Sequence, residues 1–109
     1  MKRVRLETVE LVDPASFHEA FKRLLGFPEW YGANMNAWID CMSDLDDTKY
    51  GITQFKLGSG EMLVIEVADA ESFAKRVPDV FEDFVACTAS VNRRYFNRVG
   101  EPVVTLAFL

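Results

Sequence analysis

The chain has no run of apolar residues approaching the roughly 20 that a helix needs to cross a bilayer. Its basic first residues, Met1 to Glu7, are not followed by an apolar block and a small-residue cleavage site, so we expect no signal peptide. Lysine and arginine are too few in any one place to bind a phosphate backbone, and the net charge of -5 is unfavourable for nucleic acid or an anionic membrane. We therefore expect a cytoplasmic protein without a direct nucleic-acid or membrane partner.

Histidine and cysteine are also scarce, which limits the chemistry open to the chain. The single histidine, His18, has no acid or nucleophile in an identifiable arrangement, so we expect it to be solvent-exposed and not catalytic. Cys41 and Cys87 both lie within predicted helices, and neither is close in sequence to a histidine or a second cysteine. Two buried thiols are therefore expected, with no disulfide, no zinc site and no cofactor.

What the chain has in quantity is apolar surface. Half of its 109 residues are apolar and nine are phenylalanine, enough to build one core without covalent staples. We find no internal repeat, linker or low-complexity segment. The prediction is a single domain over residues 1–109, monomeric when free.

The first half of the chain carries clear start and stop signals. Val4 and Leu6 alternate with charged residues, the period of a half-buried strand. Asp13 followed by Pro14 predicts a helix start, and Gly26 predicts its end after about residue 25. Asn34 is a good N-cap for a second helix.

The second half contains two nearly continuous apolar runs, 62–67 and 103–109, as expected for strands covered on both faces. Between them we predict a short helix from the cap Asp69 to about residue 75, and a longer one from Pro78 to Gly100. Residues 52–57 also suit a short strand, with a hairpin turn at 56–61.

Helical segments between strands favour parallel pairing with right-handed crossovers. The predicted fold is therefore α/β, a small, mostly parallel three-stranded sheet packed with helices.

The most informative segment runs from Pro28 to Asp47. It contains no lysine, arginine or histidine, although five acidic residues occur in it. At about 100° per residue, the helix after Asn34 has an apolar stripe of Met35, Trp38, Met42 and Leu45 and an opposite polar stripe of Asn36, Asp40, Ser43 and Asp47. An acidic surface beside an aromatic turn predicts docking onto a basic partner.

Residues 28–41 read PEWYGANMNAWIDC, which closely resembles the signature of the barstar family, the intracellular inhibitors of the ribonuclease barnase. The helix before it, with Phe17-His18 and the Gly26-Phe27-Pro28 turn, is similar as well. The resemblance implies a barstar-like fold and an inhibitor instead of an enzyme, with the second helix and its preceding turn inserted into a cationic ribonuclease active site. It implies no cofactor.

Residue by residue, the resemblance places Asp40 at the family's central carboxylate and Trp30 at an aromatic that packs over a catalytic histidine. Asn36 stands where the family has an aspartate, and Ile39 where it has a tryptophan. The predicted partner-binding residues are Trp30, Tyr31, Gly32, Asn34, Asn36, Ile39, Asp40, Ser43, Asp44 and Asp47.

Several of these residues also have structural interpretations. Trp30 and Tyr31 suit either partner contact or packing of the turn, Gly32 suits a special backbone angle, and Ile39 suits the edge of the core. Asp44 and Asp47 are expected to extend the acidic face at the end of the helix.

The later helix departs from the family, which has an acidic contact residue there. Here residues 92–98 are basic, and we expect Arg93 or Arg94 either to neutralise Asp40 in part or to meet an acidic rim on another partner. The expected target is thus a related secreted ribonuclease or a nuclease toxin with a basic active-site cleft, and not barnase.

Two other functions remain open at this stage. One is a barstar-like scaffold that binds a protein other than a nuclease. The other is a metal-assisted hydrolase using Asp40, Asp44 and Asp47, although the ligand spacing and glycine of a calcium loop are missing and no nucleophile is placed.

Overall fold

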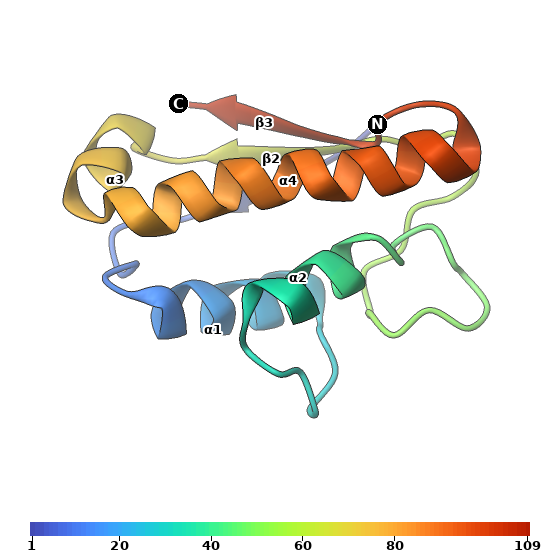
Figure 1. Cartoon of the computed structure of the whole chain (residues 1–109), viewed down its shortest axis with the longest axis horizontal. Coiled ribbons are helices and arrows are strands. Elements are labelled where there is room, and N and C mark those ends of the chain that lie inside the picture. The colour runs from blue at the N-terminus through green and yellow to red at the C-terminus, as the bar shows by residue number, and fades with distance from the viewer.

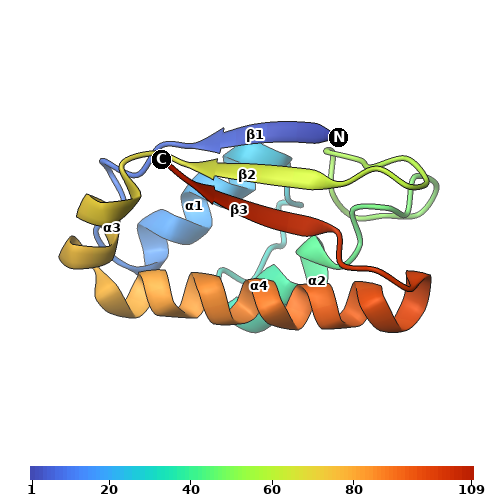
Figure 2. The ribbon, with the colours of Figure 1, turned by 90° about the horizontal axis from the view of Figure 1, so that it is seen from above.

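A computed structural model describes all 109 residues. Three parallel strands, β1 (Lys2–Leu6), β2 (Leu63–Val67) and β3 (Val104–Phe108), form a sheet in the order β1-β2-β3. The main helices lie below the sheet in Figure 1, and Figure 2 shows the strands from the uncovered side. The predicted α/β fold with a small three-stranded sheet is confirmed, and its pairing is entirely parallel.

Alternation along the strands decides which side chains enter the core. Leu63, Ile65 and Val67 of the central strand are fully buried, because they point at the helices, whereas Glu66 points to the open face and is half-buried. Leu6 of β1 is paired with Val67 and is buried on the same side.

The predicted strand at 52–57 and the hairpin at 56–61 are wrong. The backbone N–H groups of Gln54 and Phe55 donate singly to the carbonyl groups of Gly26 and Leu25, so this segment lies against the end of the first helix and forms no ladder. A turn does occur where Glu61 N–H donates to the Gly58 carbonyl oxygen. It leads into β2, whose two neighbours are both parallel, and no antiparallel hairpin is possible there.

The helix boundaries follow the local signals. Helix α1 (Pro14–Leu25) begins where Asp13 Oδ1 accepts from Ser16 N–H at 2.8 Å, and it ends at Gly26 with φ of 66°. Helix α4 (Pro78–Val99) ends at Gly100 with φ of 89°. The short helix α3 (Ala70–Arg76) starts after Asp69 as predicted, but that side chain makes no capping hydrogen bond.

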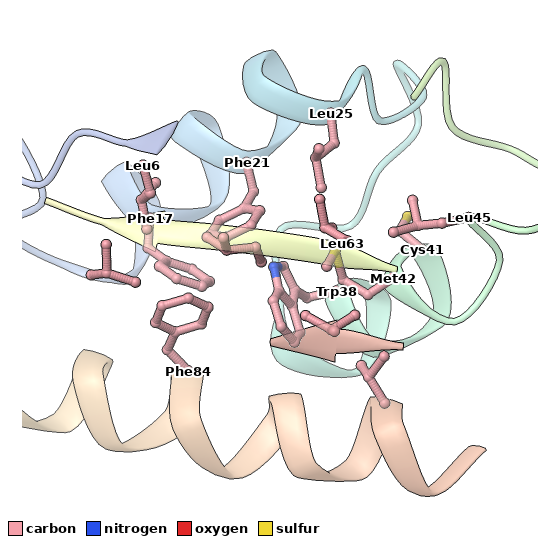
Figure 3. Packing of buried hydrophobic residues seen from close by; sticks show 14 of the residues in the cluster. Leu6, Phe17, Phe21, Leu25, Trp38, Cys41, Met42, Leu45, Leu63 and Phe84 are labelled. Carbon is pink, nitrogen blue, oxygen red and sulfur yellow. The ribbon is translucent and has the colours of Figure 1, made fainter. Parts of the chain in front are cut away.

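The core lies between the sheet and the helices, and its centre is aromatic (Figure 3). The ring centroid of Trp38 is 5.5 Å from Phe21 of α1 and 5.9 Å from Phe84 of α4, both in edge-to-face geometry. Phe17 also contacts Phe84, at 5.4 Å. Aromatic pairs at these separations add to the burial energy of each ring, so the segment that carries Trp38 is firmly held between the two longer helices. No helix is both long and apolar enough to span a bilayer.

Candidate functional site

The candidate site is built on α2 (Met35–Met42) and the turn before it. Asn34 Oδ1 accepts from Ala37 N–H at 2.8 Å, which confirms the predicted N-cap. Trp38, Cys41 and Met42 are buried, whereas Asn36 and Asp40 are exposed on the opposite side of the helix. The predicted division into a core stripe and a polar stripe is confirmed for residues 35–42, which form the helix.

The turn itself has an unexpected backbone. Gly32 does not carry the special angle that we predicted; the left-handed residue is Ala33, with φ of 52°. Gly32 instead lies close to the cap, since its carbonyl oxygen accepts from Asn34 Nδ2 at 3.3 Å and an added Cβ would lie 3.3 Å from that same nitrogen. A side chain at position 32 would therefore crowd the residue that starts the helix.

Tyr31 and His18 tie the turn to α1. His18 Nδ1 and Tyr31 Oη are 2.5 Å apart, and the Tyr31 ring packs edge-on against Phe27 at 4.9 Å. His18 is only 4% exposed, so our expectation of a solvent-exposed histidine is wrong. Its spacing to buried Phe21 and Leu25, three and seven residues later, was the signal for burial. Burial lowers the pKa of His18 and raises that of Tyr31.

Trp30 lies at the tip of the same turn and is 71% exposed. Its neighbour Glu29 forms an ion pair with Lys22 of α1 at 3.6 Å. Tyr31 therefore holds the turn against α1, whereas the ion pair of the fully exposed Glu29 adds little, and the indole itself remains free for contact.

Asp40 forms an ion pair with α4. Its Oδ1 lies 2.8 Å from Arg94 Nη1, and the two side chains are 64% and 53% exposed. The sequence-based expectation that Arg93 or Arg94 neutralises Asp40 is thus met by Arg94. The pair faces solvent, so both charges are accessible to a partner.

Helix α2 ends at Met42, and the predicted continuation of its acidic face is wrong. Asp44 Oδ2 accepts from Ile52 N–H at 2.9 Å, and Asp47 Oδ1 accepts from Tyr50 N–H at 2.9 Å. The hydrogen bond from Tyr50 N–H also lowers the pKa of Asp47. The two carboxylates order the loop at 44–52, because they supply acceptors that its backbone lacks.

Two residues of α4 that bind the end of α2, Tyr95 and Arg98, were not among the predicted site residues. Tyr95 Oη donates to the Met42 carbonyl oxygen at 2.5 Å and accepts from Leu45 N–H at 3.2 Å. Arg98 binds the Ser43 carbonyl oxygen at 2.8 Å and Asp46 Oδ2 at 2.7 Å. Ser43 Oγ donates to the Ile39 carbonyl oxygen, so Ser43 caps the helix and Ile39 packs against the core. The basic run at 92–98 was the only sequence feature that pointed to contacts between α4 and the end of α2.

A metal-assisted hydrolase would use the carboxylates of Asp40, Asp44 and Asp47, but each of them has a different partner. Asp40 pairs with Arg94, and the other two accept hydrogen bonds from backbone N–H groups. No group of three side chains suited to hold a metal ion occurs in the structure. The geometry offers no support for metal-assisted hydrolysis at this surface.

Comparison with known protein families shows which family the chain belongs to. The family model described as Barstar (barnase inhibitor) matches residues 1–107. The chain belongs to the barstar family. Barstar proteins inhibit ribonucleases and are not enzymes, and the four helices and three parallel strands seen here are consistent with a small barstar-like α/β fold. No curated protein sequence matches the chain.

Proposed function

We propose that this barstar is an intracellular inhibitor that blocks the cationic active site of a ribonuclease, either the cell's own secreted enzyme or a toxin. The observation that carries the proposal is the position of Asp40. By sequence resemblance it matches the family's central carboxylate, and it lies on the exposed side of a helix whose other side is buried in the aromatic core.

The chemistry of the site suits a phosphate-binding cleft. Asp40 Oδ2 makes no hydrogen bond within the chain, so one carboxylate oxygen is available to arginine, lysine or histidine donors of an enzyme. Hydrogen bonds between two charged groups are shorter and stronger than neutral ones. A carboxylate held in this way would occupy the place of the RNA phosphate.

Contacts within the chain hold this surface in the conformation that we propose for binding. The Asn34 cap fixes the start of α2, Trp38 fixes its buried face, and the His18–Tyr31 contact fixes the turn that presents Trp30. A preorganised surface loses little conformational entropy on association, and an exposed tryptophan is a frequent anchor in interfaces. Among the other predicted partner-binding residues, we assign the rim of the interface to Gly32, Asn36, Ile39 and Ser43. Asp44 and Asp47 would contribute through long-range electrostatic attraction to the partner.

The experiment is an inhibition assay against small secreted ribonucleases, with barnase in the set and the nuclease encoded beside this chain added where one exists. We expect one of them to be inhibited, and Asp40→Ala to weaken that inhibition more than tenfold, which corresponds to about 1.4 kcal/mol. Circular dichroism checks that the fold is unchanged. Glu71→Ala on the remote α3 removes the same charge and should leave inhibition intact.

Equal inhibition by the wild type and Asp40→Ala would exclude the proposed role of this carboxylate. A tight partner that does not cleave RNA would instead identify the chain as a barstar-like scaffold for another class of protein.

A further inference from the structure

The docking surface is not uniformly acidic, because α4 adds arginines to it. Of the three arginines in residues 92–98, Arg98 donates through both terminal nitrogens, to Asp46 and to the Ser43 carbonyl oxygen. One nitrogen of Arg94, Nη1, donates a hydrogen bond to Asp40 Oδ1. Arg93 takes part in no ion pair or side-chain hydrogen bond.

A hollow of about 360 Å³ lies beside these two side chains, lined by Ala89, Ser90, Arg93 and Arg94. Its lining residues include two arginines and one serine and no acidic residue. The acidic residues of α4, Asp79, Glu82 and Asp83, all lie in its first two turns, at least seven residues before Ser90. The positive charge at this hollow is therefore not balanced by acids of its own helix.

Helix-dipole stabilisation does not account for these arginines. A cation at a helix C-terminus interacts favourably with the dipole only within about the last turn. Arg98 is the basic residue of that turn, whereas Arg93 lies more than a turn earlier. Arg93 contributes neither to a cap nor to an ion pair, yet it keeps a long charged side chain at the edge of the docking surface.

We propose that Arg93 and Arg94 form a basic flank of the docking surface that receives an acidic side chain from the rim of the partner's cleft. The inference rests on the proposed function and specifies the partner further. A partner whose contact surface carries only cationic side chains would bring these close to the like-charged Arg94, because Arg94 lies 2.8 Å from Asp40. A partner that carries a carboxylate next to its cationic cleft would satisfy both charges, and mismatched charges would reject other nucleases.

The test compares the affinity of charge variants for the ribonuclease that the wild type inhibits in the assay above. Arg93→Glu is the cleanest change, because Arg93 has no partner within the chain. We expect it to weaken binding at least tenfold, and Arg94→Glu to do the same even though that change adds negative charge beside Asp40. Arg5→Glu on β1, which lies at the opposite edge of the sheet from α4, is the matched control for net charge (Figure 2).

The outcomes separate the two proposals. Loss of binding by Asp40→Ala, with unchanged or tighter binding by Arg93→Glu and Arg94→Glu, would overturn the basic flank and leave the inhibitor role standing. No loss by Asp40→Ala would overturn the inhibitor role itself. Where the flank holds, changing an acidic rim residue of the nuclease to lysine should restore binding of Arg93→Glu, and a double-mutant cycle would measure the coupling.

Discussion

Arg94 Nη1 lies 2.8 Å from Asp40 Oδ1, joining α4 to α2 across 54 positions of sequence at the centre of the candidate interface. Both side chains are more than half exposed, so solvent screening leaves this pair little value for stability. Its consequence is for recognition, because it turns an acidic surface into one that presents both signs of charge. A partner has to match that pattern and not merely supply cations.

The two tryptophans should separate stability from binding. Trp38→Ala removes a fully buried ring from the core and should lower the free energy of unfolding by about 3–5 kcal/mol. Trp30→Ala should change it by no more than about 0.5 kcal/mol, because that side chain is exposed, while weakening ribonuclease inhibition. Urea unfolding and the inhibition assay measure the two effects. A large stability loss in Trp30→Ala would show that its ring packs the turn instead.

Tyr95 should stabilise the end of α2 through its hydroxyl group. Tyr95→Phe leaves the Met42 carbonyl oxygen and the Leu45 N–H without their partner, which should cost about 1–3 kcal/mol of unfolding free energy. The exposed Tyr50 is the control, since Tyr50→Phe should have no measurable effect in the same denaturation experiment. Unchanged stability of Tyr95→Phe would mean that solvent replaces both bonds.

His18 should make stability depend on pH. Burial lowers its pKa in the folded chain, so below about pH 6.5, its ordinary value, the unfolded chain binds a proton that the folded chain does not. The free energy of unfolding should therefore fall as the pH decreases from 6.5 toward the lowered pKa of the folded state. Proton NMR titration of His18 should give a pKa below 6.5. His18→Gln should remove this part of the pH dependence, and an identical profile in that variant would assign it to other groups.

Two glycines should respond differently to the same substitution. Gly26 and Gly60 both have positive φ, so alanine costs about 1–2 kcal/mol of backbone strain at either position. At Gly26 the new Cβ would also lie 2.5 Å from Gln54 Cβ, whereas at Gly60 nothing lies within 4 Å. Gly26→Ala should therefore lower the unfolding temperature clearly more than Gly60→Ala. Equal effects in thermal unfolding would mean that Gln54 moves away without cost.

Part of the fold followed directly from local chemistry. The Asp13 and Asn34 caps and the helix ends at Gly26 and Gly100 are where the sequence predicted them, because caps and left-handed glycines act within a few residues. The apolar runs at 62–67 and 103–109 became strands as predicted, but the expected cover on both faces is wrong, because the helices lie on one face of the sheet and Thr105 of β3 is exposed on the other. The strand predicted at 52–57 did not form, because the backbone N–H groups of Gln54 and Phe55 bind the carbonyl groups at the end of α1 and not a neighbouring strand.

The sequence by itself determined the order of elements, the core and polar stripes of α2, and the residues by which the chain resembles a ribonuclease inhibitor. The tertiary structure alone decided that Arg94 pairs with Asp40, that His18 is buried against Tyr31, and that Asp44 and Asp47 bind their own loop. Periodicity and caps report interactions over a few residues, which is why they can be read directly. The charge pattern of the docking surface depends on how α4 packs against α2, and that packing brings together residues whose separation in sequence carries no signal.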